Sequence, residues 1–290
     1  MTGVAVIDSS GSVQRTSPTN WLAMIPPKIF WSGLFLGLVA LMALLGPWVG
    51  PDPNMIDPDI PTIAPGAAEH WFGTDDLGRD LFSRVAVGAR ISLLIGIATA
   101  LVAVVIGTLY GIVSAQFEGR VDTVMMRVID VIYSLPGLMI VILFSVFLGR
   151  GVLSLVLALA LFSWPDTARI IRGQVLALKR EEFVEAVHSL GGSSWRIAGR
   201  HFLPNLVGLI ILTATITVPR AILTESTLSF IGLGVEPPLS SWGTLASEGW
   251  QLVRIAPHVM LAPALMIFTA MIALNLLGDG LRELLEPKKS

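Results

Sequence analysis

Residues that could do chemistry are few in this chain, and their spacing does not build a catalytic centre. No Gly-Lys dipeptide occurs, so the chain lacks the P-loop that cradles nucleotide phosphates. Gly191 and Ser193 give only a weak echo of a membrane-protease motif, in a polar loop. The histidines form no His-Glu-x-x-His pair and are scattered at His70, His188, His201 and His258. The sequence therefore predicts no catalytic residue, no metal site and no cofactor bound by this chain.

Ionisable residues also stand at the predicted ends of apolar segments. Asp130 follows Arg127, and Asp166 precedes Arg169 by one helical turn. Such residues more often form packing ion pairs or mark the membrane surface than relay protons. We expect no carboxylate near the midplane of any span, which argues against a proton-coupled carrier.

Glu225 stands at the predicted outer end of an apolar segment. Its carboxylate could bind a cationic substrate group or a neighbouring arginine, or could be a helix-end charge in water, and both readings stay open. Residues 226–235 are apolar but too short to span, which predicts a loop that dips into the membrane surface. A possible outer gate or substrate path is therefore expected at Glu225, Ser229, Phe230 and Trp242.

The amino-acid composition indicates whether the chain folds in water or in a lipid membrane. The chain has 290 residues, of which 53% are hydrophobic and 14% charged, whereas soluble domains carry about 25% charged residues. This deficit predicts a membrane protein. The net charge of -2 gives no basic field for nucleic acid, and the absence of cysteine excludes disulfides and thiolate sites.

Six stretches approach the roughly 20 apolar residues that a spanning helix needs. Because backbone groups must be paired in hydrocarbon, we expect helices. The fourth stretch is apolar only over 151–165 and reaches the surface through its arginines. The sequence thus predicts an all-α multi-pass membrane protein with six transmembrane helices, at residues 29–49, 91–113, 131–148, 151–172, 202–219 and 255–278.

Orientation follows from the basic residues, which favour the cytoplasmic side. They gather in the 166–201 segment and the C-terminal tail, whereas 50–80 carries seven acidic residues against Arg79 alone. Six spans with both termini cytoplasmic fit this pattern. Five spans, with 151–172 re-entrant, would place the 50–80 and 179–201 loops on one side or invert one end.

The predicted organisation divides the chain at these spans. Thr74 is expected to cap an amphipathic helix lying at the outer interface. Two pairs of glycines, Gly33-x-x-x-Gly37 and Gly107-x-x-x-Gly111, could pack helices within the chain or between subunits. The divisions are a cytoplasmic tail 1–28, the first span 29–49, an extracytoplasmic loop 50–90, a core 91–278 with an inner loop 179–201 and a re-entrant outer loop 224–254, and a cytoplasmic tail 279–290.

The inner loop predicts a small helix-turn-helix. Residues 179–190 contain helix formers with an apolar stripe, and Gly191 and Gly192 end that helix. Ser193 or Ser194 can cap a second helix through Arg200, before the next span. The result is a rigid projection that fits a groove on a partner, or a helix pair lying on the membrane surface.

This loop resembles the "EAA" signature of permease subunits in bacterial ABC importers. The matching residues are Glu185-Ala186-Val187, Gly191 and His201-x-Leu203-Pro204, with Val187 in place of the usual alanine. Further stretches resemble the C-type permease of dipeptide and oligopeptide importers, the DppC/OppC group. They cover most of 25–287 and include 70–80, 88–93, 163–173, 225–234, 237–243 and 275–282.

The resemblance implies a type I ABC importer permease in the bacterial plasma (inner) membrane. Such a chain would pair with a related B-type permease, two cytoplasmic ABC ATPase domains that bind ATP and Mg²⁺, and an extracytoplasmic peptide-binding protein. The chain itself would not be an enzyme. The ATPase-coupling residues would be Glu185, Ala186, Val187, Gly191, Gly192, Arg196, Leu203 and Pro204.

Other cargoes and mechanisms stay open at this point. The same permease type could serve nickel, glutathione or another small solute, because selectivity largely belongs to the binding protein. A stand-alone secondary transporter would show inverted repeats and midplane ionisable groups, and the sequence shows neither pattern.

Overall fold

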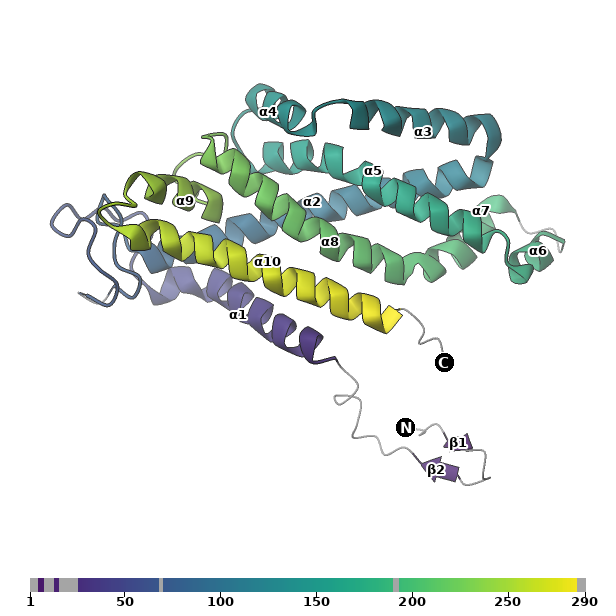
Figure 1. Cartoon of the computed structure of the whole chain (residues 1–290), viewed down its shortest axis with the longest axis horizontal. Coiled ribbons are helices and arrows are strands. Elements are labelled where there is room, and N and C mark those ends of the chain that lie inside the picture. Colours follow the sequence, from purple (N-terminus) through teal and green to yellow (C-terminus); the bar gives the residue numbers. More distant parts are fainter. Residues whose placement is uncertain (1–4, 8–12, 16–25, 68–69, 190–192, 286–290) are drawn as a thin grey trace.

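The computed structural model describes residues 5–7, 13–15, 26–67, 70–189 and 193–285, and in these ranges the chain is mainly an elongated bundle of α-helices (Figure 1). Two short strands, β1 (Ala5–Ile7) and β2 (Val13–Arg15), pair antiparallel in the N-terminal tail. The helical elements are α1 (Pro27–Val49), α2 (Leu81–Phe117), α3 (Gly119–Ser134), α4 (Gly137–Leu148), α5 (Val152–Leu178), α6 (Glu182–Ser189), α7 (Ser194–Ile197), the π-helical turn η2 (Ala198–Phe202), α8 (Leu203–Phe230), α9 (Trp242–Gln251) and α10 (Pro257–Leu285).

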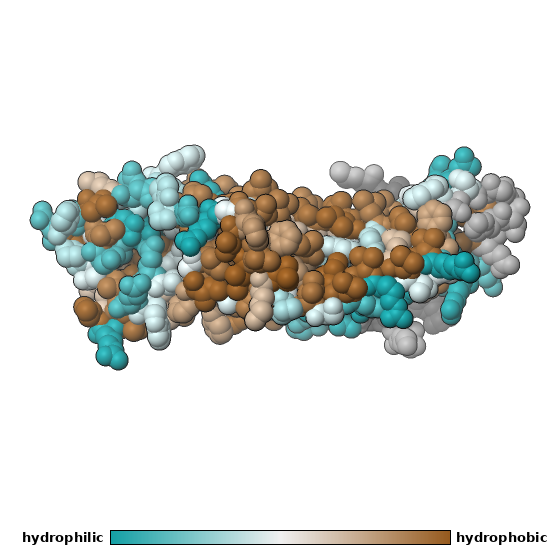
Figure 2. All heavy atoms as spheres, turned by 90° about the horizontal axis from the view of Figure 1, so that it is seen from above, coloured by the Kyte–Doolittle hydropathy of each residue, from teal (hydrophilic) through white to brown (hydrophobic). Residues whose placement is uncertain are grey.

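The described residues contain five helical stretches long and apolar enough to cross a membrane, and a bent pair that makes a sixth candidate. The five include α1, α2, α5, the stretch Trp195–Phe230 and α10, and the bent pair is α3 with α4. Their apolar side chains form a broad band between two hydrophilic ends (Figure 2). The predicted all-α multi-pass membrane fold is thereby confirmed.

The third predicted span is not one helix. Instead, α3 and α4 meet at an angle of 84°, with Leu135 and Pro136 extended between them. Proline lacks the amide hydrogen that a helix interior needs and biases the preceding residue toward extended backbone. The prediction of a continuous helix over 131–148 is therefore wrong, and the break separates α4 from the line of α3.

Two further predicted boundaries are wrong because helices continue through or past the expected ends. The helix α5 runs to Leu178, so Asp166 lies near the middle of this helix and not near its end. The helix α8 continues through Pro219 to Phe230, which makes residues 226–230 its last turns and leaves the outer loop to begin at Ile231. Asp166 and Glu225, which the sequence placed at span ends, therefore lie within continuous helices.

The predicted interfacial helix from Thr74 is also wrong. Asp80 caps α2 instead, because its carboxylate accepts a hydrogen bond from the backbone N–H of Ser83. From there α2 runs unbroken for 37 residues, which is about 56 Å and exceeds the roughly 30 Å hydrocarbon core. The 70–80 segment forms turns against the start of this helix.

The helices alternate in direction, so the connections fall at two opposite ends (Figure 1). One end carries α6 and α7, the turn from α2 to α3, the start of α1 and the end of α10. The other end carries α9 and the 50–80 segment. We call these the α6–α7 end and the α9 end.

The long helix α2 forms the centre of the bundle and packs most closely on α5. A Cβ atom built on Gly107 would lie 2.6 Å from Cβ of Thr167, and one on Gly111 would lie 2.6 Å from the carbonyl oxygen of Ala168. The second glycine pair of the sequence thus serves packing within the chain. Among the described residues, no atom lies within 4 Å of the corresponding positions on Gly33 and Gly37.

We predict that Gly111→Val destabilises the protein, because the added side chain must push α5 away from α2. Overpacking of this kind costs about 1–3 kcal/mol. The check is thermal unfolding of the detergent-purified chain followed by tryptophan fluorescence, with Gly37→Val as the matched control. Equal losses of melting temperature in the two variants would contradict this account of α2–α5 packing.

Candidate functional site

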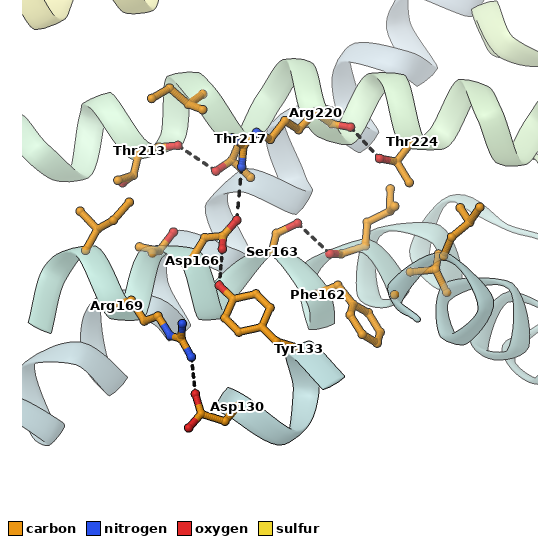
Figure 3. Close-up of a pocket in the computed structure, with 17 residues that line it drawn as sticks. Asp130, Tyr133, Phe162, Ser163, Asp166, Arg169, Thr213, Thr217, Arg220 and Thr224 are labelled. Atoms are coloured by element: carbon orange, nitrogen blue, oxygen red, sulfur yellow. Dashed lines mark hydrogen bonds and ion pairs between the residues drawn. The ribbon is translucent and has the colours of Figure 1, made fainter. Parts of the chain in front are cut away.

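A cavity of about 1050 Å³ lies between the broken pair α3–α4 and the helices α5 and α8 (Figure 3). The break at Pro136 positions α4 on one wall of this cavity. The lining combines charged, hydroxyl and apolar side chains: Asp130, Tyr133, Gly137, Leu138, Val141, Leu159, Phe162, Ser163, Asp166, Thr167, Arg169, Ile170, Thr213, Ile216, Thr217, Arg220 and Thr224.

Charged side chains from three helices meet in this cavity. Nη2 of Arg169 lies 2.5 Å from Oδ1 of Asp130, which joins α5 to α3. Nη1 of Arg220 lies 3.2 Å from Oδ2 of Asp166, which joins α8 to α5. Tyr133 donates its hydroxyl hydrogen bond to Asp166, and its ring lies beneath the guanidinium of Arg169 (Figure 3). Asp166 is thus the point that connects all three helices.

These four charged side chains are about half exposed or more, although their helices are apolar. Charge that faces lipid in a spanning helix is costly, so such residues normally border a water-filled cavity or another protein chain. Asp130 and Arg169, like Asp166 and Arg220, lie far apart in the sequence. No local pattern therefore predicted that either pair would form. The cavity face is therefore the strongest candidate for a functional surface within the spans.

A row of threonines continues the polar surface along α8. Thr213, Thr217 and Thr224 share a face because they lie four and seven residues apart. The hydroxyls of Thr217 and Thr224 donate to backbone carbonyls of their own helix, at 2.8 and 2.9 Å. Their donors are satisfied in this way, while their oxygens keep lone pairs that can accept a hydrogen bond from a ligand.

At the α6–α7 end, the structure contains the two helices of the predicted helix-turn-helix. Glu185, Ala186 and Val187 lie in α6, Arg196 is exposed on α7, and α8 begins with Leu203 and Pro204. The predicted turn at Gly191 and Gly192 falls outside the described residues. The helical part of the prediction is confirmed.

This pair of short helices is fixed to the long helices by an apolar core. Val184 of α6, Ile197 of α7 and Phe202 are buried in one cluster with side chains of α2 and α5. The ammonium of Lys179 adds a contact 2.6 Å from the carboxylate of Glu118 and donates to the carbonyl of Ala115. A force applied to α6 and α7 would therefore pass directly to the ends of α2, α5 and α8.

The residues predicted for an outer gate lie at the other end and do not line the cavity. Glu225 is fully buried and accepts a hydrogen bond of 2.6 Å from the hydroxyl of Ser229. Trp242 is also fully buried, and its indole N–H donates to the carbonyl of Val85 at 3.1 Å. Phe230 is exposed. In this structure Glu225, Ser229 and Trp242 join α8 and α9 to α2, and their place on a substrate path stays a prediction.

A buried ionic cluster at the α9 end was not predicted from the sequence. The carboxylate of Asp75 accepts hydrogen bonds from Arg79 at 2.7 Å and from Arg84 at 2.5 Å. Arg84 also reaches Glu248 of α9 at 2.8 Å. In the sequence, the acidic residues of 50–80 indicated only orientation, whereas in the structure Asp75 holds this segment onto α2 and, through Arg84, onto Glu248 of α9.

The fold and the cavity together define a class: a multi-pass helical membrane protein whose spans expose a charged, water-accessible face, as transport proteins do. A family model described as "Binding-protein-dependent transport system inner membrane component" matches residues 103–290. The chain belongs to this family of transport permeases, and it is a multi-pass protein of the plasma membrane.

Curated relatives match nearly the whole chain. The dipeptide transport system permease protein DppC of Bacillus subtilis is 43% identical over 271 residues, which cover 92% of this chain and 84% of that protein. The oligopeptide permease OppC of the same organism is 43% identical over 259 residues, covering 88% and 84%. The glutathione permease GsiD of Pectobacterium atrosepticum is 40% identical over 259 residues, covering 89% and 86%. The predicted DppC/OppC-type resemblance is confirmed.

We predict that Arg84→Ala destabilises the protein strongly, because it removes a partner from the buried carboxylate of Asp75. Because Asp75 keeps its contact with Arg79, the expected loss is that of a charged hydrogen bond, about 1.5–3 kcal/mol. Arg127→Ala is the control, since Arg127 forms only an exposed contact of 3.6 Å with Asp130. Thermal unfolding in detergent measures both, and an Arg84→Ala variant as stable as the control would contradict a structural role for the cluster.

Proposed function

We propose that this chain is one permease subunit of an ATP-driven importer of dipeptides or oligopeptides and forms half of its translocation path. The observation that carries the proposal is the position of α6 and α7, which bear the EAA-type residues and share an apolar core with the ends of α2, α5 and α8. The similarity to DppC and OppC supports peptides as the cargo.

The two ends of the bundle take different roles in this proposal. The basic residues gather at the α6–α7 end, so that end and both termini lie in the cytoplasm. Two ABC ATPase domains, which bind ATP and Mg²⁺, dock there and hydrolyse ATP, and this chain binds no cofactor. An extracytoplasmic peptide-binding protein docks at the α9 end, and a related B-type permease completes the path.

Coupling occurs through α6, α7 and the turn between them. Phe183 and Trp195 are exposed apolar side chains on this surface and supply area for a groove on the ATPase. Glu185, Ala186, Val187, Gly191, Gly192, Arg196, Leu203 and Pro204 form the coupling segment. Closure of the ATPases moves this segment as a rigid body, and the long helices alternate access around the path.

The outer gate is the junction of α8 and α9 around Glu225, Ser229, Phe230 and Trp242. Glu225, Ser229 and Trp242 are buried, which suits a junction whose helices move together as one rigid unit. The permease GsiD supports one alternative cargo, glutathione, which is itself a small peptide.

We predict that Glu185→Lys and Gly191→Asp abolish peptide uptake while the chain stays in the membrane. Reversed charge on α6, or a side chain in the turn, would prevent docking of the ATPase. Glu283→Lys is the matched control, because Glu283 is exposed at the same end of the bundle on α10. The measurement is ATP-dependent uptake of a labelled dipeptide by proteoliposomes containing the complete transporter.

Normal peptide uptake by both Glu185→Lys and Gly191→Asp would contradict the proposed function. So would gentle purification of the native complex that yields this chain alone, active in vesicles without ATP, since that behaviour belongs to a secondary transporter.

A further inference from the structure

The cavity between α3–α4, α5 and α8 has the size of a small-ligand site. Its volume of about 1050 Å³ is at the upper end of the roughly 300–1,000 Å³ typical of such sites. A single ion would leave nearly all of this space empty. A peptide of a few residues fits the volume.

The charged lining is balanced between the two signs. Asp130 and Asp166 supply two carboxylates, and Arg169 and Arg220 supply two guanidinium groups. Complementary charge selects a partner more by excluding wrong ones than by raw affinity. A wall with separate positive and negative groups and no net charge suits a ligand with one ammonium and one carboxylate.

The ion pair between Asp166 and Arg220 is weak enough for a charged ligand to replace either residue. It has one ionic contact of 3.2 Å, and its side chains are 49% and 70% exposed. Exposed pairs of this kind contribute little net stability, so this one can be broken at small cost. By contrast, Arg172 binds Asp122 through two contacts of 2.5 Å, with exposures of 29% and 14%, in the manner of a structural pair.

The rest of the wall suits a peptide of any sequence. Apolar side chains such as Leu138, Phe162 and Ile216 line the cavity together with the threonines of α8. Threonine oxygens can accept from peptide N–H groups, and apolar surface tolerates varied side chains. Nothing in this wall requires a particular ligand side chain.

We propose that this cavity is a transient binding site for the charged ends of a zwitterionic peptide. The peptide ammonium displaces the guanidinium of Arg220 from Asp166, and the peptide carboxylate binds the freed Arg220. One weak ion pair is thereby exchanged for two, and no net charge enters the membrane. The inference rests on the proposed function, since it supplies the site through which an imported peptide passes.

The first test uses the complete transporter in proteoliposomes with ATP, its binding protein and labelled dialanine. Asp166→Asn and Arg220→Gln should each lower uptake about tenfold or more, because each removes one of the two charged contacts to the peptide and leaves the remaining charged group of the site without its partner. ATP hydrolysis stimulated by the loaded binding protein should persist, so more ATP is used per peptide. Arg220→Lys, which keeps the charge, should restore part of the uptake.

Lys28→Gln is the matched control. It removes one member of an interhelix pair, Lys28–Glu283, whose side chains are 49% and 53% exposed and lie outside the cavity. Uptake and the ratio of ATP to peptide should stay at the wild-type level. If the cavity variants also transport like wild type, the inference is overturned while the proposed function stands. If the wild-type transporter imports no peptide at all, that result contradicts the proposed function itself, and with it the inference.

A second test does not depend on the charged variants folding. The chain has no cysteine, so Thr217→Cys places a single thiol in the cavity, and Thr215→Cys places one on α8 outside it. Millimolar dialanine should slow modification of Thr217→Cys by a charged methanethiosulfonate in the reconstituted complex without binding protein, and should leave Thr215→Cys unaffected. Equal protection by N-acetyl-dialanine amide, which has no charged ends, or no protection by dialanine, would overturn the inference.

Discussion

The cost of exposing charge to hydrocarbon is the constraint on which this structure depends. Four of the charged side chains on the spanning helices gather on one face, where Asp166 joins α3, α5 and α8. That face cannot be covered by lipid at low cost, so it must border water or another chain. A face of this kind is consistent with a family whose members are components of larger transport systems.

The same helices that hold the ion pairs also pack against α6 and α7, which bear the proposed coupling segment. Asp166 lies about 18 Å along α5 from its junction with α6, and Arg220 lies about 26 Å along α8 from its start. Because Val184, Ile197 and Phe202 share one buried core with α2 and α5, α6 and α7 cannot move independently of these helices. A displacement at one end thus reaches the cavity through continuous helix, without an intermediate hinge in α5 or α8 being required.

Local sequence rules predicted the elements and failed where distant residues decide the outcome. Apolar length predicted the spans, and helix formers with a glycine stop and a serine cap predicted α6 and α7. The Leu135-Pro136-Gly137 run could have revealed the break between α3 and α4, because proline chemistry is local. The pairing of Asp166 with Arg220, and the burial of Glu225 and Asp75, follow from how helices pack, which no periodicity or motif in one sequence records.

The most direct test of this account measures whether ATP binding at the α6–α7 end changes the cavity. Spin labels on Ser163→Cys of α5 and Thr224→Cys of α8 can be placed directly, since the chain has no cysteine. In the complete transporter, double electron–electron resonance should show a different label-to-label distance with bound ATP than without nucleotide, and the shift should vanish with Gly191→Asp. Identical distance distributions with and without ATP would contradict the claim that this chain couples ATPase closure to its cavity.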